Sequence, residues 1–233
     1  MGSMMDERQQ ADMIRDQRRN YAVFAIWAVL VGEALFALVT QRWSTLFVAV
    51  ATLVLSMLPA IFASRFDIRL PVSFFAAAVI FIFATIFLGE AGNFYEKYWW
   101  WDVVLHAGSA VGFGLLGFLF IFMLFEGDRY AAPAWAIGFM AFSLAVSIGA
   151  IWEIFEFAMD QTFGLNMQKN GLQDTMWDLI VDCLGAGFGA TMGFLYLKGR
   201  ELGGLGSSLD EFVRLNRRLF KKARLRRGRN REE

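Results

Sequence analysis

Long apolar runs alternate with short polar joints along the chain. Six runs approach the roughly 20 residues that an α-helix needs to cross a bilayer. They cover residues 21–39, 45–63, 72–90, 103–124, 132–158 and 174–197. A membrane β-barrel would instead show segments of about ten residues with alternating polarity. The pattern therefore predicts an all-α fold, a polytopic bundle of about six transmembrane helices.

Composition agrees with a membrane domain flanked by two polar ends. Hydrophobic residues make up 57% of the 233 residues and charged residues only 19%, against about a quarter in soluble domains. The charged residues crowd the ends of the chain and a few joints. We therefore expect an N-terminal segment over 1–20, a transmembrane domain over 21–197 and a basic tail over 198–233.

Lysine and arginine are distributed unequally between alternate joints. The two ends, with the joints after the second and fourth runs, hold 19 of the 22 basic residues. The other side has only Arg42, Lys97 and Lys169. Because positively charged loops stay in the cytoplasm, we predict that both termini are cytoplasmic.

Acidic residues show the opposite bias, and several fall inside the apolar runs. Ten of the 22 belong to the extracytoplasmic half: Glu33, Glu90, Glu96, Asp102, Glu153, Glu156, Asp160, Asp174, Asp178 and Asp182. Ionisable side chains in a membrane span are costly, and they normally face the protein interior or an aqueous cavity. This asymmetry is the main functional indication in the sequence.

Three runs carry polar side chains spaced by three or four residues near their extracytoplasmic ends, which places each set on one helical face. The sets are Asp102, His106 and Ser109 in the fourth run, Glu153, Glu156 and Asp160 in the fifth, and Asp174, Asp178 and Asp182 in the sixth. The last set would descend about 12 Å into the membrane. Glu33, in the first run, is expected at a similar depth.

Glycines repeat every four residues directly inward of two of these sets. Gly108 and Gly112 form a pair in the fourth run, and Gly185, Gly189 and Gly193 form a triplet in the sixth. Small residues at this spacing let helices approach closely. We expect both patterns to hold the extracytoplasmic ends of these two helices together.

So many carboxyl groups cannot all be ionised at close quarters without a proton or a bound cation, and few basic residues lie on this side. Oxygen ligands with one imidazole suit Mg²⁺, Mn²⁺, Ca²⁺ or Zn²⁺. We expect a divalent metal ion, its identity open. The expected ligands are Asp102, His106, Glu156, Asp178 and Asp182, and the expected acid/base groups are Glu153 and Asp174. No nucleophile elbow or HExxH motif is present, so water is the expected nucleophile.

Simpler interpretations stay open for some of these residues. His106 could be a core histidine bonded to Asp102, and the acids of the fifth run could mark the point where that helix leaves the membrane. Asp174 could be a helix N-cap, a position that aspartate favours. Asp178 and Asp182 lie one and two turns further in, which favours a functional or polar-network role.

The tail predicts an amphipathic helix between Leu209 and Arg227. Its apolar stripe comprises Leu209, Phe212, Val213, Leu215, Leu219 and Phe220, while Leu225 lies off the stripe. A basic amphipathic helix is typical of segments that lie on an anionic membrane surface. The expected partners are therefore membrane lipids, with the tail on the anionic cytoplasmic leaflet; we expect no nucleic acid, and a homo-oligomer stays open.

The last three runs resemble a bacterial inner-membrane family of unassigned biochemistry, the YjdF type. The matching segments are Asp102-Val-Val-Leu-His106, Trp152-Glu-Ile-Phe-Glu-Phe157 and Asp174 to Ala186. The order of motifs is also similar to VanZ-like proteins, although Glu156 stands where that family has an amide. The resemblance implies a multi-pass protein of the bacterial inner membrane, and VanZ-like proteins are associated with the cell envelope and glycopeptide tolerance.

These observations favour a metal-dependent hydrolase or transferase that acts on a lipid or lipid-linked envelope substrate. One alternative is a cation or proton-coupled transporter, although the sixth run is small and apolar inward of Asp182 and no inverted repeat is evident. The other alternative is a noncatalytic envelope or assembly protein whose polar network only fixes helix packing.

Overall fold

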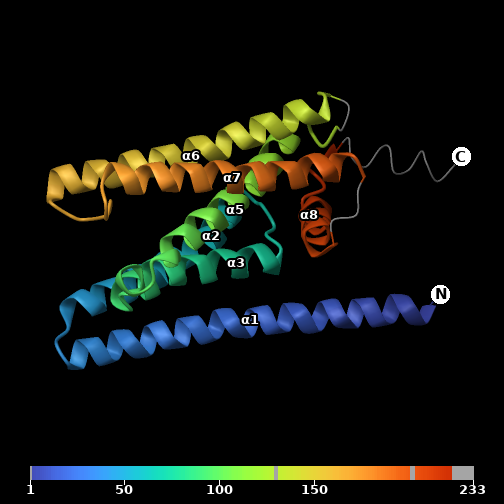
Figure 1. Cartoon of the computed structure of the whole chain (residues 1–233). Helices are drawn as coiled ribbons and strands as arrows, with labels where there is room; N and C mark the ends of the chain where they lie inside the picture. The colour runs from blue at the N-terminus through green and yellow to red at the C-terminus, as the bar shows by residue number, and fades with distance from the viewer. Residues whose placement is uncertain (1, 129–130, 200–202, 222–233) are drawn as a thin grey trace, which may run out of the picture. The chain divides into compact units, whose positions relative to one another are not determined.

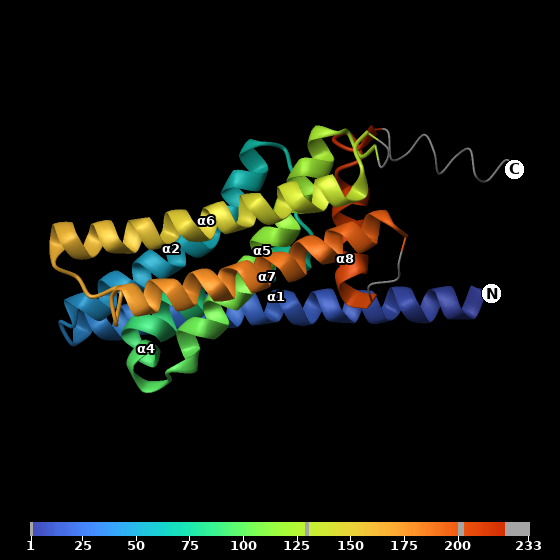
Figure 2. The same ribbon diagram turned by 45° about the horizontal axis from the view of Figure 1, so that its top comes forward.

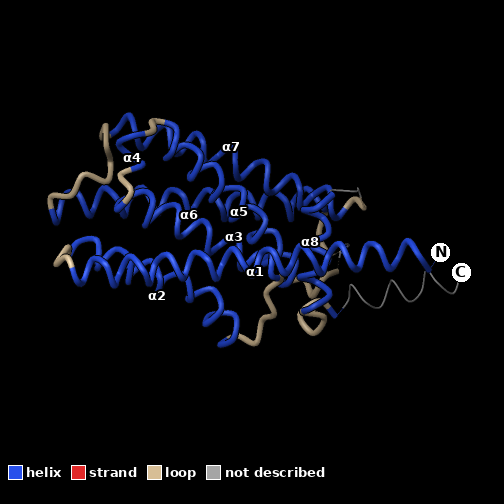
Figure 3. Tube along the Cα trace, turned by 90° about the horizontal axis from the view of Figure 1, so that it is seen from below, coloured by secondary structure: helices blue, strands red, loops and turns tan. Residues whose placement is uncertain are grey.

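The computed structural model describes residues 2–128, 131–199 and 203–221, and the regular structure in these ranges is helical throughout (Figure 3). In chain order the elements are α1 (Gly2–Val39), α2 (Trp43–Arg65), α3 (Val72–Ile82), the π-helix η1 (Phe83–Ala91), α4 (Phe94–Lys97), α5 (Trp100–Leu124), α6 (Ala134–Phe163), α7 (Leu172–Leu197) and α8 (Gly203–Leu215).

Among the described residues, six helical stretches are long and apolar enough to cross a membrane. They are Gln17–Val39, Trp43–Arg65, Val72–Ala91, Trp100–Leu124, Ala134–Phe163 and Leu172–Leu197. This confirms the all-α fold with six spans. The fifth span differs most from its prediction, because α6 continues five residues beyond 158, to Phe163. It ends at Gly164, whose φ of 65° is a left-handed conformation that glycine adopts without steric cost.

The chain divides into two compact units, residues 1–101 and 102–233. In the first unit, α1 packs against α2 and α3 (Figure 1). Val23 of α1 and Ala76 and Val79 of α3 form a small buried core. The indole N–H of Trp27 donates a hydrogen bond to Ser56 Oγ of α2 at 3.0 Å, which satisfies two polar groups within apolar helices.

In the second unit, α6 and α7 run side by side (Figures 1 and 2). Small residues bring α5 close to both helices. A Cβ added to Gly114 of α5 would lie 3.0 Å from the backbone of Ala186 and Gly189 in α7. One added to Gly117 would lie 3.1 Å from the carbonyl oxygen of Ala141 in α6. The three helices are therefore in backbone contact.

The glycine prediction is confirmed for the sixth span and wrong for the fourth. Gly185 and Gly189 meet the α5 backbone, where an added Cβ would lie 2.8 Å from Ala107 O and 2.5 Å from Val111 O respectively. A Cβ on Gly108 or Gly112 would meet no atom within 4 Å among the residues that the structure describes. The face of α5 that meets α7 therefore passes through Ala107, Val111 and Gly114, about 100° around the helix from the predicted pair.

Within the described residues, the predicted helix of the basic tail is interrupted after Leu215. The helix α8 ends at Leu215 and turns follow it. At this end the side-chain Nδ2 of Asn216 donates to the Phe212 carbonyl oxygen at 2.8 Å, a local bond that competes with continued helix. The rest of the predicted helix, from residue 222 and including Leu225, lies outside the described residues.

The apolar side of α8 and the turns after it packs against the bundle. The buried side chains of the predicted stripe are Leu209, Phe212 and Phe220. The Phe220 ring lies 5.5 Å from that of Phe122 in α5, and Tyr196 Oη of α7 donates to Asp210 Oδ1 at 2.9 Å. These apolar side chains thus contact protein, where the sequence predicted contact with the membrane surface. Attraction of the basic side chains to anionic lipids stays a prediction.

The contact between α5 and α7 predicts a position-dependent cost of adding one methyl group. Gly189→Ala should lower the free energy of unfolding in detergent by about 1–3 kcal/mol, because the methyl group would overlap the α5 backbone. Gly187→Ala on the same helix is the control, since its Cβ would meet only Phe142 at 4.0 Å. Denaturant titration followed by helical circular dichroism measures both; equal stability of the two variants would contradict this packing.

Candidate metal centre

Three helices of the second unit place acidic side chains and the single histidine at one end of their bundle. Asp102 and His106 lie in the first two turns of α5, and Asp178 and Asp182 in the early turns of α7. Glu153 lies in the late part of α6, which runs in the opposite direction to α7. Asp178 and Asp182 are each 3% exposed and His106 8%, whereas the Asp102 side chain is 33% exposed, so the cluster is buried except on the Asp102 side.

The two ring nitrogens of His106 have different surroundings. Nδ1 lies 3.3 Å from Asp182 Oδ1. This contact is a hydrogen bond from the ring to the carboxyl group in the tautomer that carries its hydrogen on Nδ1. Nε2 faces the other way, 3.9 Å from Asp102 Oδ1 and 4.0 Å from Glu153 Oε1. The ring thus has one nitrogen engaged by Asp182 and the other directed at a group of acids.

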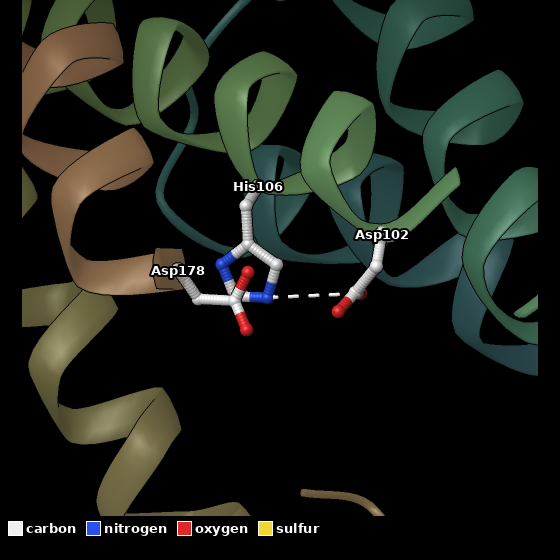
Figure 4. Close-up of side chains that lie close together, drawn as sticks. All are labelled: Asp102, His106 and Asp178. Carbon is white, nitrogen blue, oxygen red and sulfur yellow. Dashed lines mark ion pairs between the residues drawn. The ribbon is translucent and has the colours of Figure 1, made fainter. Parts of the chain in front are cut away.

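Asp102, His106 and Asp178 form a group suited to hold a metal ion. One potential ligand atom from each lies within 4.8 Å of the other two. Figure 4 shows Asp102 and His106 from α5 and Asp178 from α7 with their side chains directed toward one another. Two carboxylates and one imidazole are ligands for Mn²⁺ and Zn²⁺, and carboxylate oxygens also suit Mg²⁺ and Ca²⁺.

Glu153 is a buried carboxyl group beside this site. Its side chain is 4% exposed, and neither carboxyl oxygen has a hydrogen-bond partner of acceptable geometry among the described residues. One candidate donor is the Thr175 hydroxyl of α7, whose contact with this carboxyl group falls short of that geometry. A buried polar group without a partner is costly, and a buried charge far more so. Glu153 therefore needs a proton or a cation in the space that it shares with His106.

Acidic groups outnumber basic groups around the imidazole. Four carboxyl groups, from Asp102, Glu153, Asp178 and Asp182, surround the one ring. Lys169 interacts electrostatically with Asp102 but is itself exposed at the loop. Buried charges of one sign require a compensating partner of the other, and a divalent cation would supply it.

Two further predicted acids hold the loop between α6 and α7. The Asp160 carboxylate accepts hydrogen bonds from the backbone N–H groups of Met167 and Gln168, at 2.7 and 2.9 Å. Asp174 Oδ2 accepts one from the backbone N–H of Lys169 at 2.9 Å. The helix N-cap itself is Gly171. Both acids therefore have loop-ordering contacts.

The remaining predicted residues lie outside the group of three. Glu156 is half-buried one turn beyond Glu153, and its Oε1 accepts a hydrogen bond from Trp152 Nε1 at 2.8 Å. The hydroxyl of Ser109 donates to the His106 carbonyl oxygen at 2.9 Å, within its own helix. Glu33 lies half-buried on α1, in the first unit.

Two features of the site escaped the reasoning from sequence. Gly149 lies against the Asp182 side chain, where an added Cβ would be 3.0 Å from Cγ and still closer to Oδ2. Gln168 Nε2 donates to Thr175 Oγ1 at 2.6 Å, linking the loop to the residue that faces Glu153. The spacing of Gly149 four residues before Glu153 was a signal, since it places both on one face of α6.

Comparison with known proteins gives a distant relative without an assigned role. An uncharacterized protein of Thermotoga maritima is 38% identical over 105 residues, which cover 45% of this chain and 53% of the relative. The match thus spans about half the length of that protein. No solved structure matches the chain. The VanZ-like resemblance receives no support from these comparisons.

A family model covers nearly all of the membrane domain. The model of DUF2238, described as a predicted membrane protein, matches residues 21–199. This agrees with the YjdF-type resemblance and with the six apolar helices. The chain is therefore a multi-pass membrane protein that belongs to the DUF2238 family of predicted membrane proteins.

Proposed function

We propose that Asp102, His106 and Asp178 bind a divalent metal ion, and that the protein is a metal-dependent hydrolase or transferase for a lipid or lipid-linked envelope substrate. The observation that carries this proposal is the convergence of one potential ligand atom from each of these residues within 4.8 Å of the other two. A metal ion between the three ligands would compensate the surrounding carboxylates.

The ligand set favours catalysis over a purely structural metal. Structural zinc sites usually have four protein ligands, whereas catalytic zinc sites keep a coordination position for water or substrate. Only three ligand residues converge among the described residues. A metal ion there would act as a Lewis acid and lower the pKa of a bound water.

Glu153 is placed to act as the general base. Its carboxyl group shares the space of the ligand group without being a member of it. In hydrolysis the water oxygen adds to the carbonyl or phosphorus atom of an ester, and its proton passes to Glu153. The same proton then goes to the departing alcohol oxygen when the ester bond breaks.

The position of the site at the ends of three spans supports a lipid substrate. Asp102 and His106 lie in the first two turns of α5, and Asp178 lies about 9 Å along α7 from its start, so the site is near the ends of these two spans and close to the expected headgroup region. Large apolar side chains near this end are exposed on α6 and α7, including Trp152, Phe155 and Trp177. If both termini are cytoplasmic, as the distribution of lysine and arginine predicts, this end faces away from the cytoplasm, toward envelope lipids.

The inner part of the bundle argues against the transport alternative. Inward of Asp182, the buried residues described on α7 are glycines and alanines until Tyr196 and Leu197 at the helix end. Gly185 and Gly189 lie against the α5 backbone, and Gly193 lies against the Phe118 side chain of α5. A substrate path needs polar groups or water along its length, and this contact offers neither.

Metal binding is the first test. The purified protein should bind one divalent ion, measured by elemental analysis and by titration with Mg²⁺, Mn²⁺, Ca²⁺ and Zn²⁺. Asp178→Asn should weaken binding by more than about 100-fold, beyond the range for residues outside the ligand sphere. Glu90→Gln, which removes an exposed acid at the end of another span, should bind as the wild type does. Full metal occupancy in Asp178→Asn would remove this residue from the ligand set.

The role of Glu153 is tested separately from metal binding. Glu153→Gln should keep the metal ion but lower turnover by about 10²–10⁴-fold, because the amide cannot accept the proton. Turnover is measured by mass spectrometry of bacterial envelope lipids incubated with the metal-loaded protein in vesicles. Release of headgroups at the wild-type rate by Glu153→Gln would contradict a general base. Cation flux across the vesicle membrane without lipid turnover would instead support the transport alternative.

A further inference from the structure

We propose that Asp182 is a positioning residue for His106 rather than a metal ligand, and that Gly149 is glycine because the Asp182 carboxylate occupies the space of a side chain there. This inference rests on the proposed metal centre. It gives the two nitrogens of the ring different roles, since Asp182 holds Nδ1–H and thereby leaves Nε2 to bind the metal ion.

The contacts of Asp182 separate it from the ligand group. Its Oδ1 lies 3.3 Å from His106 Nδ1, and its side chain is 4% exposed. The convergent group instead contains Asp178, one turn earlier on the same helix. Metal-binding histidines almost always donate their second N–H to a carboxylate or carbonyl group, which fixes the tautomer and the ring orientation. Asp182 occupies this place.

Gly149 explains how the carboxylate fits between helices. A Cβ at this position would lie 3.0 Å from Asp182 Cγ and 3.3 Å from its Cβ, and would overlap Oδ2. The backbone of Gly149 is ordinary helix without a positive φ. Because alanine is the better helix former, backbone conformation gives no reason for glycine here. The space taken by Asp182 gives one.

The two residues of α6 that border the His106 ring lie on one face of this helix. Gly149 and Glu153 are four residues apart, so they follow each other along the same side of the helix. Gly149 borders the carboxylate that holds Nδ1, and Glu153 faces Nε2. This face therefore sets the surroundings of both ring nitrogens.

The hydrogen bond can be tested by NMR on metal-free protein. His106 is the only histidine, so ¹⁵N-labelled histidine reports this ring alone. A downfield Nδ1 proton that exchanges slowly with water should appear in the wild type and be lost in Asp182→Ala and Gly149→Ala. Gly138→Ala, whose Cβ meets α7 only at ordinary contact distances of 3.5 Å and more, should keep it. Retention of the signal in Gly149→Ala would overturn the steric role.

Metal titration then distinguishes positioning from ligation. With Mn²⁺ or Zn²⁺, Asp182→Ala and Gly149→Ala should each weaken binding about 10–100-fold, as changes beyond the ligands do. The double variant should bind no more weakly than Asp182→Ala, because Gly149 acts through Asp182. If Asp182→Ala lost as much metal affinity as Asp178→Asn, Asp182 would be a ligand. If the losses of affinity in Asp182→Ala and Gly149→Ala added up in the double variant, Gly149 would not act through Asp182.

The two proposals can fail independently. If no metal binds the wild type while the Nδ1 proton behaves as expected, the positioning role stands and the proposed function fails. If Gly149→Ala does not fold, the double variant decides the steric role, since removing the Asp182 carboxylate should restore folding. Failure of the double variant to fold would overturn the steric role of Gly149.

Discussion

The arrangement of the second unit depends on one constraint, that several buried carboxyl groups share a single imidazole. The ring lies between Asp182 on one side and Asp102 and Glu153 on the other. The ring, Glu153 and Asp182 are buried, and each of these groups is expensive to bury alone. Each helix must therefore present its polar residue at the depth and rotation where the others can meet it. A shift of one residue in any of the three helices would turn its acid about 100° away.

Backbone contact between α5 and α7 makes this meeting possible. Gly185 and Gly189 let α7 approach the backbone of α5 directly inward of Asp182 and His106. A closer approach shortens the distance that the side chains must span, so that the short Asp182 side chain reaches the ring. The contact between the small residues of α7 and the α5 backbone is apolar, and the polar end of the two helices lies next to it. The apolar contact therefore fixes how far apart the polar side chains lie. Gly149 has a similar effect on α6, because its lack of a side chain leaves room for the Asp182 carboxylate.

Helical periodicity predicted much of this arrangement, because it determines which residues of a single helix share a face. Hydropathy located all six spans, and spacing placed Asp102 with His106 on one face and Asp178 with Asp182 on another. Periodicity could not say which α7 acid joins the ligand group, since the two differ by only about 6 Å and 40°. That choice depends on how α7 is rotated against α5. The same rotation explains why Gly108 and Gly112 were wrongly assigned to the contact, which Gly114 makes instead.

The contrast between the two ends of this bundle bears on what the site can do. At the inner end, aromatic packing of Phe220 on Phe122 and the bond from Tyr196 to Asp210 join the tail to α5 and α7. Between the two ends lies the close contact of small residues. A carrier must expose its site alternately to both sides, which requires such contacts to separate during each cycle. Backbone contact over several turns opposes that separation, whereas an enzyme at the membrane surface needs access from one side only.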